Sequence, residues 1–209
     1  MKRFTISSCA MCCAIPLILG AGIVLLIAWA INSGYHKQYL TMCPSNLKQI
    51  GLAIFMYDQD YGEKLPPAIF HNKTVGWANG LQPYLKSYDL VQCPIEKNPL
   101  QKVPQPNQPG FSDYWLNSNI AGLEDKKIMA PVQLIMLGDG DGGSPDSTAS
   151  YAIDRLPASW LQLPVPPMTR HAGGANYAFA DGHVKWLKPF QISQLPSSKK
   201  HPVFTFVNK

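Results

Sequence analysis

A long apolar run dominates the N-terminal part of the chain. No residue between Phe4 and Tyr35 is formally charged, and positions 14–31 read AIPLILGAGIVLLIAWAI. As a helix, this run extends about 27 Å, close to the thickness of the hydrocarbon core of a bilayer. The pattern predicts a transmembrane helix over residues 14–34, preceded by a short segment, residues 1–13.

The charges on either side of the run predict its orientation. Lys2 and Arg3 precede it, whereas only Lys37 follows it closely, and basic ends stay in the cytoplasm. We therefore expect a single-pass protein with residues 1–13 in the cytoplasm and the rest of the chain outside. The alternative is a cleaved signal peptide, because Ala28-Trp29-Ala30 matches the small-x-small pattern at which signal peptidases cut.

A stripe of apolar residues continues the helical pattern. It repeats at spacings of three and four, which places its members on one face of a helix: Leu40, Cys43, Leu47, Ile50, Ile54, Tyr57 and Tyr61. We expect an amphipathic helix over residues 35–62. A kink or short break is expected at Cys43-Pro44, because the residue before a proline avoids the helical conformation. Gly62, followed by Pro66-Pro67, predicts the end of the helix.

Residues 63–190 carry short apolar pieces separated by Gly, Pro and Asn, which is typical of strands joined by long loops. Gln133–Leu137 predicts a buried strand. Apolar and polar residues alternate around Asp181-Gly182, a strong hairpin signal. A two-residue turn there pairs Phe179 with Val184 and Tyr177 with Trp186, with one face in the core and the other wetter. In the tail, residues 191–209, Val203–Val207 is strand-like.

Composition narrows the class of protein. The chain of 209 residues is 46% hydrophobic and 15% charged and has 19 prolines, which fits a membrane-attached, loop-rich domain. The net charge is +5, but every acidic residue lies at or before Asp181, and five lysines follow it. The body is therefore neutral and the tail basic, a distribution that disfavours nucleic acid as a partner.

The cysteines fall on both sides of the apolar run. Cys9, Cys12 and Cys13 precede it, and Cys43 and Cys93 follow it. Two exported cysteines can pair, so we predict a Cys43–Cys93 disulfide. The Cys9-x-x-Cys12 spacing lacks a second pair or a nearby His, and we interpret these residues as thiols beside the membrane.

Candidate chemistry is sparse. Asp139, Asp141 and Asp146 lie in a glycine-rich loop and are a candidate Ca²⁺ site, although the EF-hand pattern is not met. His171 and Asp181 suggest a base and its carboxylate, but extended strand residues between them place the two roughly 17 to 20 Å apart. We expect Asp181-Gly182 to form a turn, Gly173-Gly174 a bend, and His171 a cap or a local hydrogen bond. No nucleophile elbow, phosphate loop or zinc-protease helix occurs, so no catalytic residue is assigned and the protein is expected not to be an enzyme.

Two blocks of sequence resemble the prepilin-type proteins with an H-X9-DG signature, relatives of type II secretion pseudopilins and type IV pilins. The first reads CPSNLKQIGLA at 43–53, continued by Met56-Tyr57, Asp60-Tyr61 and Leu65-Pro66-Pro67. The second reads RHAGGAN at 170–176, where His171 is followed by nine residues and then by Asp181-Gly182. The family motif residues are His171, Gly173, Gly174, Asp181 and Gly182, and Cys93-Pro94 also sits where such proteins often have Cys-Pro.

The resemblance implies an α+β, pilin-like fold in which a long N-terminal helix, transmembrane and then amphipathic, packs on an antiparallel sheet. It implies a structural or assembly protein of a type II secretion or type IV pilus-like system, anchored in the bacterial inner membrane. Its partners would be the membrane and other pilin-like subunits or secretion components, with no cofactor. The alternative is an anchored or secreted extracytoplasmic binding domain, Ca²⁺-dependent in one version, that does not polymerise.

The N-terminus departs from the family pattern. Family members usually show Gly-Phe-Thr-Leu-Ile-Glu, whereas this chain reads KRFTISS at 2–8, with no glycine before Phe4 and Ser8 where the glutamate stands. In the family, that glutamate neutralises the N-terminal amine of a neighbouring subunit. Its replacement therefore predicts a degenerate processing motif and the loss of the ion pair that sets subunit register.

Overall fold

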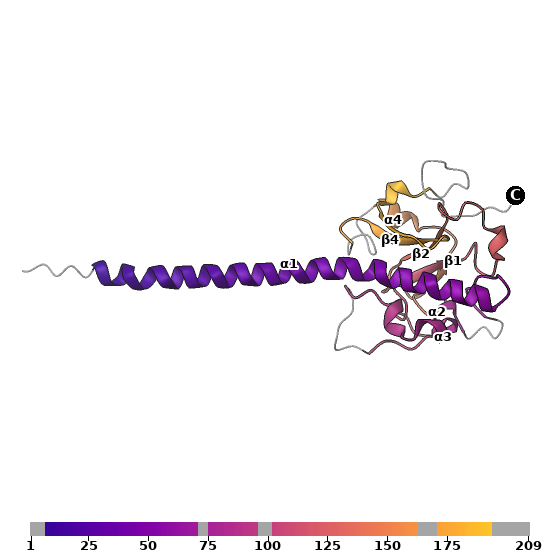
Figure 1. Ribbon diagram of the computed structural model, residues 1–209, viewed down its shortest axis with the longest axis horizontal. Helices are drawn as coiled ribbons and strands as arrows, with labels where there is room; N and C mark the ends of the chain where they lie inside the picture. The colour runs from indigo at the N-terminus through magenta and orange to yellow at the C-terminus, as the bar shows by residue number, and fades with distance from the viewer. Residues whose placement is uncertain (1–6, 71–74, 96–101, 163–170, 194–209) are drawn as a thin grey trace, which may run out of the picture. The chain divides into compact units, whose positions relative to one another are not determined.

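The computed structural model describes residues 7–70, 75–95, 102–162 and 171–193 (Figure 1). The chain divides into two compact units, residues 1–39 and 40–209. Helix α1 (Ser7–Asp60) accounts for every described residue of the first unit and continues into the second. Residues 1–6 and the strand-like segment Val203–Val207 lie outside the described residues. Within the described part, no helix carries an apolar stretch long enough to cross a membrane.

The second unit has an α+β fold built on a five-stranded sheet in the order β3-β1-β2-β4-β5. The strands are β1 (Tyr114–Asn117), β2 (Ile135–Asp139), β3 (Ala152–Ile153), β4 (Ala175–Phe179) and β5 (Val184–Leu187). The short helices are α2 (Trp77–Gly80), α3 (Gln82–Leu85) and α4 (Ala158–Gln162), with 3₁₀ turns η1 (Tyr88–Val91), η2 (Asp125–Lys127) and η3 (Pro189–Gln191). The predicted buried strand at Gln133–Leu137 corresponds to β2, which begins two residues later.

The sheet is mixed, which corrects the expectation of an antiparallel one. β3 pairs in parallel with β1, whereas the other three pairings are antiparallel. The loop after β2 passes β1 and returns the chain to the end of the sheet where β2 finished. A strand that starts there must run opposite to β2, and therefore parallel to β1. A two-residue edge strand of this kind leaves no periodic signal in the sequence.

The second-unit part of α1 supplies one side of the main core. Cys43, Leu47, Ile50 and Ile54 are fully buried, as the stripe predicted. Tyr61 is an exception at 58% exposure, because α1 ends at Asp60 and Tyr61 stacks on the ring of Tyr57 at a centroid distance of 4.2 Å.

The expected break at Cys43-Pro44 is absent, since α1 remains helical through both residues. Proline removes one backbone hydrogen bond from a helix interior. The covalent link at Cys43 and the burial of Leu47 hold the helical backbone on either side of it. The helix ends where predicted, next to Gly62, whose φ of 73° is the left-handed conformation that glycine adopts most readily.

The sheet separates two cores. On the α1 side, Leu116, Met136, Ala178 and Ala180 pack in one cluster with the α1 stripe. On the other side, Trp115, Ile135, Tyr177 and Phe179 pack with Trp160 of α4 and with Leu156. All five residues of β4 are therefore buried, which corrects the expectation of a wetter face for this strand, whereas Lys185 and Trp186 of β5 are exposed.

The β4–β5 register differs by one residue from the prediction. The observed pairs include Ala178 with Val184 and Tyr177 with Lys185, in place of Phe179 with Val184 and Tyr177 with Trp186. The Gly182 N–H donates to the Phe179 carbonyl at 2.9 Å, and the Phe179 N–H donates to the His183 carbonyl at 2.9 Å. The loop thus has three residues, with Gly182 at a φ of 87°. An Asp-Gly pair suits this loop as well as the two-residue turn, so the sequence signal did not distinguish them.

Gly76 provides a test of this packing. Its φ of −81° is accessible to alanine, but a Cβ there would overlap the backbone of Ala149 and Ser150. We expect Gly76→Ala to lower the free energy of unfolding by about 1–3 kcal/mol, the usual range for overpacking. Gly51→Ala is the control, because its Cβ would lie 3.7 Å from Met136 Cε in ordinary contact and favour the helix. Chemical denaturation of both variants measures this, and equal effects would contradict the packing.

A buried disulfide, histidine and aspartate cluster

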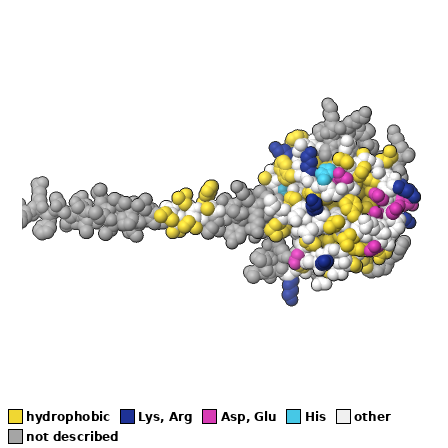
Figure 2. All heavy atoms as spheres, in the orientation of Figure 1, with side chains coloured by type: hydrophobic (Ala, Val, Ile, Leu, Met, Phe, Trp, Pro, Cys, Tyr) yellow, Lys and Arg dark blue, Asp and Glu magenta, His cyan; other side chains and the backbone are white. Residues whose placement is uncertain are grey.

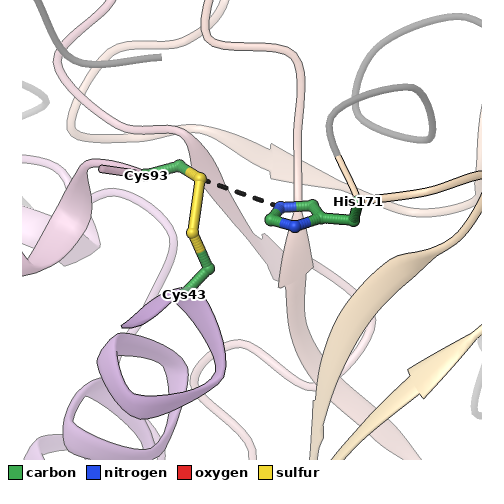
Figure 3. A group of neighbouring side chains, drawn as sticks. All are labelled: Cys43, Cys93 and His171. Atoms are coloured by element: carbon green, nitrogen blue, oxygen red, sulfur yellow. Dashed lines mark hydrogen bonds between the residues drawn. A yellow bond between two sulfur atoms is a disulfide. The ribbon is translucent and has the colours of Figure 1, made fainter. Parts of the chain in front are cut away.

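The candidate site is centred on a disulfide between α1 and the segment after η1. Cys43 and Cys93 are both fully buried and are joined as predicted, with Cα atoms 5.6 Å apart (Figure 3). The bond closes a loop with a sequence separation of 50 residues. In the chain-entropy model, a loop of that length stabilises the folded state by about 4 kcal/mol.

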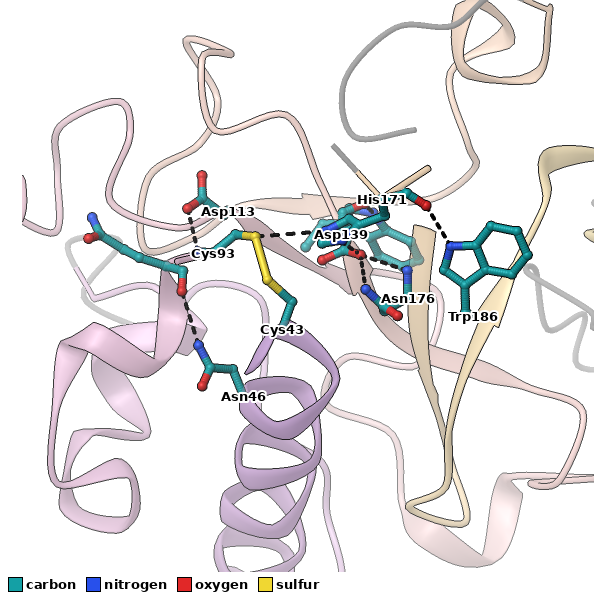
Figure 4. Close-up of polar contacts among 10 residues, drawn as sticks. Cys43, Asn46, Cys93, Asp113, Asp139, His171, Asn176 and Trp186 are labelled. Atoms are coloured by element: carbon teal, nitrogen blue, oxygen red, sulfur yellow. Dashed lines mark hydrogen bonds and ion pairs between the residues drawn. A yellow bond between two sulfur atoms is a disulfide. The ribbon is translucent and has the colours of Figure 1, made fainter. Parts of the chain in front are cut away.

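Hydrogen bonds fix the backbone around Cys93. Its N–H donates to Asp113 Oδ2 at 2.6 Å, and the Asp113 N–H donates to the Val91 carbonyl at 2.9 Å. The Asn46 amide on α1 donates to the Gln92 carbonyl at 3.1 Å (Figure 4). The sulfur of Cys93 is therefore positioned from the helix and from the start of β1 together.

His171 approaches the disulfide from the chain before β4. Its Nε2 lies 3.7 Å from Cys93 Sγ, and its side chain is 1% exposed. His171 pairs with Gly174 in an isolated antiparallel β-bridge, and Gly173 between them has a φ of 82°. The chain therefore makes the tight bend that the Gly-Gly pair predicted. The Trp186 indole N–H donates to the His171 carbonyl at 2.8 Å, and a Cβ on Gly174 would overlap that indole. The bend turns His171 toward the sulfur.

Asp139, the last residue of β2, is the carboxylate that His171 meets. Its Oδ2 lies 3.1 Å from His171 Nε2 and accepts the Asn176 backbone N–H at 2.6 Å and side-chain N–H at 2.9 Å. Figure 4 shows these groups converging from β2, β4 and the bend before β4. Asp139 is fully buried, so its contacts with His171 and Asn176 take the place of water around the carboxyl group.

Three buried polar atoms near this pair have no hydrogen-bond partner among the described residues: Asp139 Oδ1, His171 Nδ1 and the Tyr177 hydroxyl. Burial, and then the charge of Asp139, raises the pKa of the Tyr177 phenol above its ordinary value. Tyr177 therefore remains a neutral hydroxyl at physiological pH. The cluster is therefore a group of buried polar side chains, some of whose donors and acceptors are unsatisfied.

The sequence-derived site residues are distributed differently from the expectation. Local hydrogen bonding was expected for His171, but it reaches Asp139, 32 positions away in the sequence. Asp181 pairs instead with the exposed His183, at 2.6 Å from Nδ1, and the His183 ring stacks on Phe179. Asp139 was grouped with the acidic loop, although its position at the end of the apolar run of β2 is the signal for a buried carboxylate.

The three carboxylates of the candidate Ca²⁺ site do not form one group in the described part of the chain. Asp139 is buried on His171 and Asn176, whereas Asp141 accepts the Gly143 N–H at 3.0 Å within its own turn. The described residues hold a single group with metal-ligand character, Cys43, Cys93 and His171, whose ligand atoms all lie within 4.8 Å of one another. Calcium binding by the loop stays a prediction.

Removing the buried carboxylate tests the energetic role of the cluster. We expect Asp139→Ala to lower the free energy of unfolding by about 3–5 kcal/mol, because His171 and both Asn176 donors lose their acceptor in the core. Asp141→Ala is the matched control and should change it by less than about 1 kcal/mol, since it removes one turn hydrogen bond at a partly exposed residue. Denaturant unfolding of the oxidised protein, followed by near-UV circular dichroism, measures both. A small loss in both variants would refute the role.

Comparison with known proteins covers part of this site. A family model described as "Protein of unknown function (DUF1559)" matches residues 41–117. No curated protein and no solved structure matches the chain. The matched segment contains the α1 stripe from Cys43 onward, both disulfide cysteines and Asp113, whereas Asp139, His171 and Asn176 follow it. The chain is thus similar to this family over the part that carries the disulfide.

Proposed function

We propose that the protein is a membrane-anchored, pseudopilin-like structural subunit of a type II secretion or type IV pilus-like system in a bacterial inner membrane. The observation that carries the proposal is the contrast within α1. Leu47, Ile50 and Ile54 are fully buried in the domain core, whereas the apolar residues at 23–27 and Trp29 are more than half exposed.

The exposed apolar part of α1 supports an anchor. Ile23, Leu26 and Trp29 are 58%, 67% and 70% exposed, and Figure 2 shows apolar side chains covering this stretch of helix. A helix that is apolar all round is stable when lipid or other helices cover it. The sequence on both sides continues the apolar run to 14–31. A bilayer and neighbouring α1 helices together would cover it.

The exported domain supports a structural role. Its disulfide suits an oxidising compartment outside the cytoplasm. His171 and Asp139 are 1% and 0% exposed, so the cluster presents no reactive group to a substrate and acts within the fold. The proposal therefore assigns the work of the protein to packing between subunits and to its surfaces, with no enzymatic step.

The N-terminal sequence defines how such an assembly would be held. With Ser8 in place of the family glutamate, no carboxylate is present in residues 1–34 to pair with the amine of a neighbour. Apolar packing between helices would then hold the subunits. The family's ion pair would contribute nothing to the register.

Two charges in the apolar run test the anchor. We expect the wild-type chain to stay in the membrane pellet after carbonate washing and Ile23→Asp/Leu25→Asp to leave it or be degraded, because each central charge costs about 2.5–3.5 kcal/mol. The control Ile23→Ala/Leu25→Ala keeps the run apolar and should remain in the membrane. A soluble wild-type product with the intact mass of a chain that starts at Ile31 would show a cleaved signal peptide instead.

Thiol cross-linking in membranes of the native host tests assembly. Cys9, Cys12 and Cys13 are three further cysteines at one end of the run, whereas Cys43 and Cys93 are joined to each other. If α1 helices pack in a continuing array, mild oxidation should give a ladder beyond the dimer on non-reducing gels.

Two variants control this experiment. Cys12→Ser/Cys13→Ser leaves one thiol and should stop at dimers, and the triple variant with Cys9→Ser should give none. Monomers alone from a membrane-bound wild-type chain would contradict assembly and favour an anchored binding domain.

A further inference from the structure

The disulfide cluster places transition-metal ligands side by side. Cys43 Sγ, Cys93 Sγ and His171 Nε2 come together within 4.8 Å (Figure 3). Asp139 Oδ2 lies 3.1 Å from the same histidine nitrogen (Figure 4). Two sulfurs, an imidazole and a carboxylate are a donor set that Zn²⁺ accepts in four-coordinate sites. We propose that the chain with its disulfide open binds one Zn²⁺ through Cys43, Cys93, His171 and Asp139.

The distances on the histidine side already fit a tetrahedral zinc centre. With Zn–N of about 2.0–2.1 Å and Zn–S of about 2.3 Å, a tetrahedral angle separates the nitrogen and sulfur by roughly 3.6 Å. The distance from His171 Nε2 to Cys93 Sγ is 3.7 Å. The same geometry separates nitrogen and carboxylate oxygen by roughly 3.4 Å, against 3.1 Å here. In their distances to His171, Cys93 and Asp139 therefore need little rearrangement.

The sulfurs supply the movement that the site requires. Two thiolates on one tetrahedral zinc lie roughly 3.8 Å apart, whereas bonded sulfurs lie about 2.05 Å apart. Opening by roughly 1.7 Å is within the reach of two side-chain torsions. The backbones are held from outside the bond, by Asn46 on Gln92 and by Asp113 on Cys93, so the cysteines remain neighbours when the bond is absent.

Charge favours the metal in this position. Two thiolates and Zn²⁺ cancel, and the Asp139 carboxylate keeps the Asn176 donors that already compensate it. A buried pair of thiolates without a cation would be unfavourable, so without metal both sulfurs carry protons. Zinc binding then releases these two protons.

The zinc form and the disulfide form exclude each other. Opening the disulfide consumes two electrons and two protons, which a dithiol or a phosphine supplies, and a newly made chain is already in that state. An oxidising protein disulfide reverses it by taking two electrons from the thiolates. Cys43 and Cys93 join, the oxidant becomes a dithiol after taking up two protons, and Zn²⁺ is released. The site thus holds the same two segments by metal before oxidation and by a covalent bond after it.

Zinc titration of the full chain in detergent tests the proposal. The parent carries Cys9→Ser, Cys12→Ser and Cys13→Ser, so that Cys43 and Cys93 are its remaining cysteines. We expect one Zn²⁺ per chain, measured by competition with a chromophoric chelator, after phosphine reduction, and none in the oxidised parent. Co²⁺ in place of Zn²⁺ should give thiolate charge-transfer bands and the visible bands of a tetrahedral centre.

Ligand variants assign the site. Cys93→Ser should abolish binding, and His171→Ala and Asp139→Asn should each weaken it at least about 10-fold. Asp141→Asn, outside the cluster, should leave it unchanged. Melting of the His171, Asp139 and Asp141 variants with the disulfide intact, and of Cys93→Ser without it, shows whether each variant folds. X-ray absorption of the zinc-loaded parent needs no ligand variant and should give two sulfurs and one imidazole. A reduced parent that takes up no zinc, or a first shell without both sulfurs, overturns the proposal.

Discussion

The Cys43–Cys93 bond is the constraint on which the arrangement of the second unit depends. It joins α1 covalently to a segment that the burial of Val91 and hydrogen bonds such as the one from the Cys93 N–H to Asp113 also hold. The same sulfur contacts His171, whose imidazole meets Asp139 at the end of β2. A helix, two strands and two loops therefore meet at one point. A shift in any of them would leave buried polar groups without partners, which is more costly than the loss of an apolar contact.

The sheet explains why that point can be fully buried. β4 has an apolar cluster on each face, with Ala178 toward α1 and Tyr177 and Phe179 toward α4. Asn176, two residues before Ala178 in the same strand, faces the α1 side and donates two hydrogen bonds to Asp139. An alternating strand thus places one polar residue into a core without breaking the apolar layer on the opposite face. The geometry of β4 makes a buried carboxylate tolerable.

The sequence predicted features that arise from contacts between residues close in the chain better than features that arise from contacts between distant segments. The α1 stripe and its end at Gly62 arise from contacts within a few residues, and a periodic pattern records them. The disulfide was predictable because two exported cysteines leave one pairing.

The hairpin was located correctly but placed one residue out of register, because a glycine with positive φ, as at Gly182, suits both loop lengths. The parallel edge strand β3 and the pairing of Asp139 with His171 depend on chain reversals between distant segments. Composition does not encode such reversals.

The position of Pro44 links the cluster to the proposed role of α1. Proline inside a helix weakens it where the hydrogen bond is lost, about one turn before the proline. Here Cys43, just before the proline, is covalently held, and Leu47, on the C-terminal side of the proline, is fully buried. The weak point of α1 is therefore clamped from the domain side. If the apolar run lies in a bilayer, a force on the anchor reaches the domain through this turn. A covalent bond there resists it in a way that a hydrogen bond of about 1 kcal/mol does not.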